Sequence, residues 1–137
     1  MASRYRLVYY ETEGGRQPVA EWFDSRPVAE QAKLAWALER LAESGYLLGP
    51  PWLRKLDDDI WELRVAYRGN QLRVLFYERA SRVLVMLLAF SKKTRRTPKR
   101  KLDTARAHLM GDGERHKKEA RSWEREPTNV TTILRTT

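Results

Sequence analysis

The spacing of apolar residues predicts a strand and two helices in the first third of the chain. Residues 5–10 are rich in aromatic and β-branched side chains, which is typical of a strand. Pro18 suits the first turn of a short helix that ends near Ser25, and apolar residues recur at helical spacing from about Pro27 to Ser44. The apolar stripe on the longer helix needs a partner surface, so we expect the helix pair to cover a sheet.

The sheet is predicted from the residues that follow Gly45, a good helix terminator. The predicted strands are 52–56, 60–67, 72–77 and 83–90. Gly69-Asn70 is a hairpin signal, and as a two-residue loop it pairs residue i with residue 139 − i. The apolar residues of the hairpin then share one face: Trp61, Leu63, Val65, Tyr67, Leu72, Val74 and Phe76. On the other face, Arg64 and Arg73 become diagonal neighbours.

A third helix with a basic start is predicted from Thr97-Pro98 to about Met110, where Gly111-Asp112-Gly113 should end it. We therefore expect a folded domain over residues 1–110 and a polar extension of unassigned role over residues 111–137. The order of the elements predicts an α+β fold, with an N-terminal helical hairpin, a small antiparallel-rich sheet and a C-terminal basic helix. We expect the helices to cover one face of the sheet.

Composition narrows the class of protein. A chain of 137 residues with 42% hydrophobic content fits one domain with a proper core. It has no cysteine, and its two histidines, His108 and His116, have no partner at metal-ligand spacing, so neither a metal nor another cofactor is indicated. No apolar run reaches the roughly 18–20 residues that span a bilayer, and the N-terminus lacks a signal peptide. We expect a soluble, cytoplasmic protein without a membrane partner.

The positive charge is concentrated in one short block. Residues 91–106 contain eight Lys or Arg side chains against one acid, Asp103, and so carry most of the net charge of +9. A localised field of this sign attracts a polyanion, for which nucleic acid is the default candidate. The alternative is a solvated basic helix start, but cations at a helix N-terminus oppose the helix dipole, which favours a binding role.

Arginines beside this block provide a candidate phosphate site. Arg64 and Arg73 share a predicted strand face, and Lys92 and Lys93 follow the end of the next strand. Arginine donates paired hydrogen bonds to phosphate oxygens and stays charged at any relevant pH. The alternative is that both arginines are ordinary solvated residues, with Arg64 paired to Glu62. For Glu62 itself, a salt bridge is favoured over proton transfer.

Two tryptophans near the proposed site have a simpler explanation than binding. Trp52 and Trp61 could stack on nucleobases, but both flank or occupy predicted strands. We therefore interpret them as core residues.

Four motifs in this order resemble the phage-derived HigB-like branch of the RelE/ParE toxin superfamily. They are Leu53-Arg-Lys-Leu56, Ile60-Trp-Glu-Leu-Arg64, Arg73-Val-Leu-Phe76 and Leu88-Ala-Phe-Ser-Lys-Lys-Thr-Arg-Arg-Thr-Pro98. The resemblance covers about residues 5–110, and its most specific parts are Trp-Glu-Leu-Arg and Phe-Ser-Lys-Lys-Thr-x-x-Thr-Pro. It implies a RelE-like, microbial RNase-type fold and the toxin component of a type II toxin–antitoxin system.

The resemblance also implies partners and site residues. Such toxins cut mRNA in the ribosome and are neutralised by a helix-turn-helix, HigA-like antitoxin. The catalytic positions of the family map onto Arg64, Arg73 and Lys93, with Lys92 adjacent. The superfamily tyrosine near the C-terminus has no clear counterpart, so the proton donor is unassigned. The expected RNA-binding residues are Lys55, Arg95, Arg96, Lys99, Arg100 and Lys101.

The implied chemistry is metal-independent RNA cleavage. The ribose 2′-OH attacks the adjacent phosphate, the 5′-oxygen leaves, and a 2′,3′-cyclic phosphate forms. Arg64 and Arg73 would stabilise the charge on the phosphoryl oxygens. Lys93 or Lys92 would transfer a proton, since neighbouring cations disfavour a protonated ammonium. Two alternatives keep the fold but change the activity: a ParE-like gyrase inhibitor without nuclease activity, and an RNA-binding domain that cleaves nothing.

Overall fold

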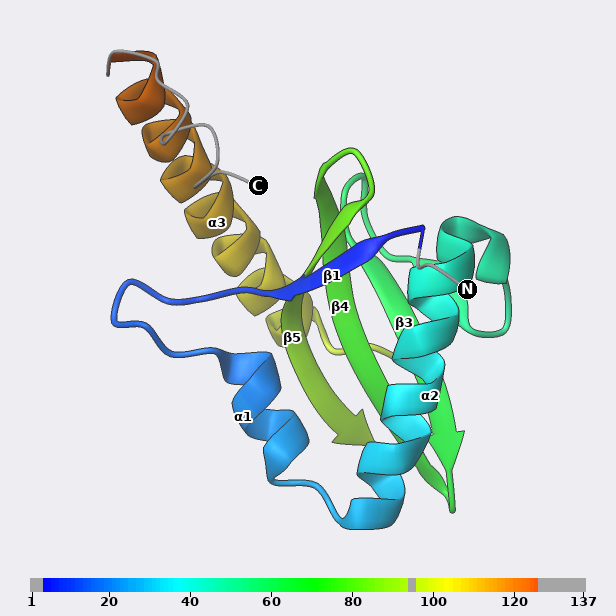
Figure 1. Ribbon diagram of the computed structural model, residues 1–137. Helices are drawn as coiled ribbons and strands as arrows, with labels where there is room; N and C mark the ends of the chain where they lie inside the picture. Colours follow the sequence, from blue (N-terminus) through cyan, green and yellow to red (C-terminus); the bar gives the residue numbers. More distant parts are fainter. Residues whose placement is uncertain (1–3, 94–95, 126–137) are drawn as a thin grey trace.

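The computed structural model describes residues 4–93 and 96–125 and contains a five-stranded sheet between two layers of helix (Figure 1). The strands are β1 (Arg6–Tyr9), β2 (Leu53–Lys55), β3 (Trp61–Tyr67), β4 (Asn70–Ala80) and β5 (Val83–Lys92). Their order in the sheet is β1-β5-β4-β3-β2; β1 runs parallel to β5 and the other pairs are antiparallel. The predicted α+β class and antiparallel-rich sheet are confirmed.

The helices cover both faces of the sheet, whereas the sequence predicted that they cover only one. The helical elements of the described residues are α1 (Pro18–Asp24), α2 (Val28–Ser44), the 3-10 helix η1 (Gly45–Leu48) and α3 (Lys99–Arg125). Helices α1 and α2 pack on one core cluster, where Leu34 and Leu41 meet Phe76. Helix α3 packs on the other, where Ala105 meets Leu75. The one-sided prediction was wrong because β4 and β5 bury side chains on both faces, and each apolar face needs its own cover.

The turn between β3 and β4 comes one residue earlier than predicted, so each residue of β3 pairs with a residue of β4 two positions earlier. Tyr67 pairs with Asn70, so residue i pairs with residue 137 − i. The loop is Arg68-Gly69, and both residues have positive φ, 47° and 81°, as a primed hairpin turn requires. Because the shift is even, every side chain keeps its predicted face. The predicted apolar set therefore does lie in one cluster, and the two arginines become direct partners instead of diagonal ones.

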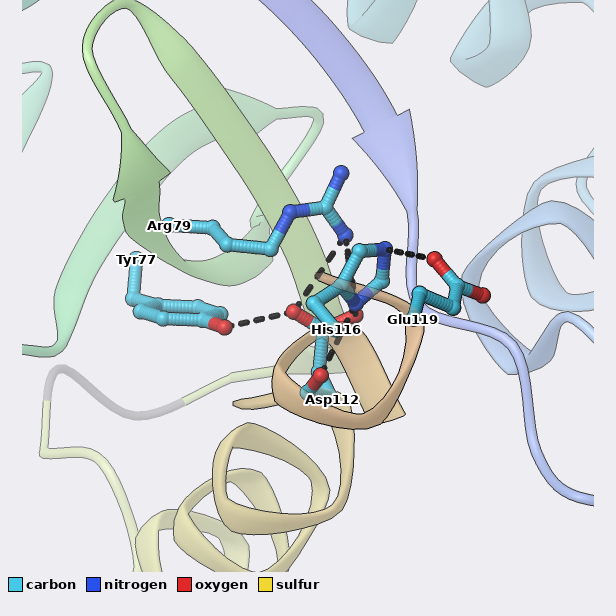
Figure 2. Close-up of polar contacts among 5 residues, drawn as sticks. All are labelled: Tyr77, Arg79, Asp112, His116 and Glu119. Atoms are coloured by element: carbon cyan, nitrogen blue, oxygen red, sulfur yellow. Dashed lines mark hydrogen bonds and ion pairs between the residues drawn. The ribbon is translucent and has the colours of Figure 1, made fainter. Parts of the chain in front are cut away.

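Helix α3 continues past the point where its end was predicted. It runs through Gly111-Asp112-Gly113 to Arg125 and so crosses from the predicted domain into the predicted extension. Figure 2 shows why: Asp112, only 3% exposed, lies against side chains of β4. The Tyr77 hydroxyl donates to Asp112 Oδ2 at 2.5 Å, and Arg79 Nη1 donates to Oδ1 at 3.1 Å. These contacts offset the cost of two helical glycines, about 1 kcal/mol each relative to alanine.

The same contacts hold the phenol of Tyr77 in its neutral form. Burial raises the pKa of Tyr77, the hydrogen bond to Asp112 raises it further, and only Arg79 opposes the shift. His116, one turn after Asp112, lies with Nδ1 2.9 Å from the Asp112 carbonyl oxygen. Although α3 is long, neither it nor any other helix in the described ranges is long and apolar enough to cross a membrane.

Candidate functional site

The candidate site lies on the sheet face that also carries α3, near the first turn of that helix. Cross-strand partners share a face, so Arg64 of β3, Arg73 of β4 and Phe90 of β5 form one row across the sheet. Lys101, in the first turn of α3, places its Nζ 5.3 Å from the centre of the Phe90 ring. The row of arginines and the basic helix start therefore meet at one place, as the sequence predicted.

A buried carboxylate stands at the centre of this site. Glu62 and Arg73 are both 0% exposed. Glu62 Oε1 lies 3.3 Å from Arg64 Nε, and Glu62 Oε2 lies 3.8 Å from Arg73 Nη1. Thr97 completes the cluster: its hydroxyl donates to Glu62 Oε2 and accepts from Arg73 Nη1 at 3.0 Å. Glu62 is thus a salt-bridge partner, as predicted, and it joins the two most specific motifs of the sequence.

The pKa of the Arg73 guanidinium depends on its burial and on the charges around it. Burial lowers the pKa of Arg73, the carboxylate of Glu62 raises it, and the charges of Arg64 and Arg54 lower it again. An arginine starts from so high a pKa that it stays protonated at any relevant pH. The site therefore contains a fixed positive charge below its surface, which contributes to the field without being exposed.

Arg64 reaches the surface where Arg73 does not. Its side chain is 21% exposed and lines a groove of about 460 Å³. The groove is walled by Pro51 and Trp52 and floored by Ala66 and Gln71. The Arg64 backbone N–H donates to the Trp52 carbonyl at 2.7 Å, which fixes that wall beside the arginine. An anion in this groove would meet Arg64 first.

Lys92 is the last residue of β5, and Lys93 is the first residue after it. Lys92 is half-buried and pairs in register with Gln71 of the groove floor. Lys93 follows as an exposed residue, and Arg96 is exposed as well. Lys99 and Arg100 are exposed in the first turn of α3, beside Lys101. Arg95 lies outside the described residues, so its predicted RNA contact stays a prediction.

One predicted RNA-binding residue, Lys55, shares a sheet face with α2 and not with Arg64, and its RNA contact stays a prediction. Lys55 pairs with Trp61, whose side chain packs in the cluster under α1 and α2. Its neighbour Arg54 pairs with Glu62 and so shares the face of the arginine row. Arg54 was not predicted as a site residue. Side chains alternate between the two faces of a strand, so the pairing of β2 with β3 places Arg54 on this face.

Two further residues have structural partners that the sequence did not reveal. Thr97 belongs to the Thr-Pro end of the last motif, yet no role was predicted for its hydroxyl. Arg106, in the basic block, forms an ion pair with Asp57 instead of facing a ligand. Among the residues that the structure describes, no group of three or more His, Asp or Glu could hold a metal ion.

The family model described as phage-derived protein Gp49-like (DUF891) matches residues 21–110, well over half of the chain. The chain belongs to the Gp49-like family. This is a RelE/toxin-like family of toxin–antitoxin systems. No curated protein matches the chain. The matched residues 21–110 include the whole Glu62 cluster and the residues that line the groove. The narrower HigB-like assignment stays a prediction.

Proposed function

We propose that the protein is the toxin of a type II toxin–antitoxin system and that it inhibits translation by cleaving mRNA in the ribosome. The Gp49-like family supports the toxin class. The observation that carries the nuclease proposal is the groove lined by Arg64, whose guanidinium is linked through Glu62 to the buried Arg73. The proposed substrate is mRNA that a ribosome is translating, so we expect the bound segment to be single-stranded.

Each arginine has a different part in the proposed reaction. Arg64 donates to the phosphoryl oxygens that gain charge when the 2′-OH attacks. Arg73 is buried, so we assign it a positioning and electrostatic role in place of the direct phosphate contact expected from the sequence. Glu62 orients both guanidinium groups, and Thr97 orients that of Arg73. Lys92, in register with the groove floor, and Lys93 next to it are the candidates for proton transfer.

The proposed function is tested by mapping the 5′ ends of cellular mRNA after induction of the protein. We expect new ends in translated regions with the wild type, and a cleavage rate lower by on the order of 10²–10³-fold with Arg64→Ala, by analogy with loss of one oxyanion donor. Arg16→Ala is the matched control, because Arg16 is an exposed arginine paired with Glu21 outside the groove. Full cleavage by Arg64→Ala would disprove the site assignment.

Two parallel assays separate the alternative activities. A gyrase inhibitor would block DNA supercoiling and leave mRNA ends unchanged. A non-catalytic RNA-binding domain would show steep salt dependence and release intact RNA. For the partner, we propose a small helix-turn-helix antitoxin encoded beside the toxin. Co-expression of that neighbour should restore growth, and continued growth arrest would contradict the pairing.

A further inference from the structure

Trp52 is the aromatic residue that lines the groove together with Arg64. Trp52 lines the groove while it also packs, partly buried, against the core cluster under α2. Its backbone is tied to that of Arg64, so the indole and the guanidinium are held beside one groove by neighbouring segments. A volume of about 460 Å³ is within the range of roughly 300–1,000 Å³ that small-ligand sites occupy.

A second tryptophan and a lysine, both of α2, lie next to Trp52, although neither lines the groove. The rings of Trp36 and Trp52 have centroids 5.3 Å apart at an interplanar angle of 59°. Lys33 Nζ lies 4.8 Å from the Trp36 centroid and 5.9 Å from that of Trp52. Trp36 is 40% exposed, so its ring is accessible to solvent. Lys33 thus lies near the Trp52 ring, while Arg64 lines the same groove as Trp52.

This arrangement has the chemistry of a single-stranded nucleic acid site. Unpaired bases stack on aromatic side chains, while arginine and lysine contact the phosphates between them. We propose that Trp52 is a stacking platform for one nucleobase of single-stranded RNA, next to the phosphate that Arg64 binds. This subsite rests on the proposed function and deepens it, because it assigns a base-binding element to the same groove. It also revises the interpretation of Trp52 as a core residue only.

The test uses two oligonucleotides of equal length and charge. One is a hexamer of 2′-O-methyl RNA, which keeps its bases but cannot be cleaved, and the other is its abasic counterpart. At one fixed salt concentration, the wild type should bind the base-bearing hexamer on the order of tenfold more tightly, the scale of one stacked base. Trp52→Phe should keep this preference. Trp52→Leu, which keeps apolar packing but lacks a ring, should remove it and leave abasic binding within about twofold.

A second readout localises the contact in the wild type, and it needs Trp52→Phe only to assign one signal. The chain has five tryptophans, and their indole N–H groups give separate signals in a proton–nitrogen correlation spectrum. The Trp52 signal, assigned by its loss in Trp52→Phe, should move with the base-bearing hexamer and stay in place with the abasic one. Trp22→Phe is the matched control, since Trp22 lies on α1 with Arg26 over its ring and does not line the groove.

The outcomes for the subsite and for the nuclease are independent. Equal binding of both hexamers by the wild type, an unmoved Trp52 signal, or equal weakening of both hexamers by Trp52→Leu would each overturn the subsite. None of these results would affect mRNA cleavage by the wild type, which tests the proposed function. Conversely, base preference that depends on Trp52 would support the subsite even if the wild type cut no mRNA.

Discussion

Replacing Glu62 by glutamine should destabilise the protein strongly, although the two side chains have nearly the same shape. Glu62 is fully buried, and its carboxylate lies within 3.8 Å of the Arg73 guanidinium, which is fully buried too. Removing one partner of a buried ion pair typically costs about 3–5 kcal/mol, because the remaining charge stays desolvated. We expect the lower end, about 3 kcal/mol, since Arg73 keeps its hydrogen bond to Thr97.

Urea unfolding measures this loss directly. With a slope of about 2 kcal/mol per molar urea, typical of small proteins, the midpoint should fall by about 1.5 M. Glu21→Gln is the matched control, because the Arg16–Glu21 pair has comparable groups but side chains 75% and 47% exposed. Its midpoint should not move measurably, since solvent screens an exposed pair.

A double variant separates the ion pair from the packing around it. Glu62→Gln combined with Arg73→Met removes both the carboxylate and the charge that it neutralises. Buried pairs can be replaced by apolar groups at little cost, so the double variant should recover much of the stability that Glu62→Gln loses. A loss below about 1 kcal/mol for Glu62→Gln alone, or purely additive losses in the double variant, would refute the reasoning.

Three further predictions concern the frame around the site. Gly45→Ala should cost at least about 1–3 kcal/mol in urea unfolding, because a Cβ there would lie 2.1 Å from the Tyr5 ring, whereas Gly69→Ala, with open space around it, should cost only the positive-φ penalty of about 1–2 kcal/mol. Asp112→Ala should lower the far-UV helical signal by on the order of four turns, and an unchanged signal would contradict the anchoring role. The raised pKa of Tyr77 means that the folded state holds this proton above pH 10 while the unfolded state releases it, so stability should fall as pH rises beyond about 10. Tyr77→Phe should make that fall shallower, and an unchanged slope would count against the assignment.

The faces of the sheet could be predicted because they depend only on a period of two. Arg64 and Arg73 were placed together although the loop was misplaced, since an even shift of register preserves every face. The loop itself was misread because Arg68 has positive φ, a conformation that arginine rarely adopts. Gly69-Asn70 carried the stronger turn signal in the sequence, while tertiary pairing selected Arg68-Gly69.

The errors in the site came from contacts between distant residues. The burial of Arg73 depends on Glu62 and Thr97, and the latter is 35 residues from the former along the chain. The continuation of α3 depends on a hydrogen bond between Tyr77 and Asp112, which are also 35 residues apart. Local propensity contains no information about either contact. The sequence could therefore place the basic helix start beside the arginines, but not show which arginine reaches the surface.

The hydrogen bond between Thr97 and Glu62 has a consequence for synthesis of the chain. Glu62 is on β3 and Thr97 follows β5 in the chain. The cluster therefore requires β3, β4 and β5 to be made and paired. A nascent chain that ends before Thr97 lacks the hydroxyl that hydrogen-bonds to both Glu62 and Arg73. Under the proposed function, the ribosome that makes this protein is exposed to a complete site only after nearly the whole matched domain has been translated.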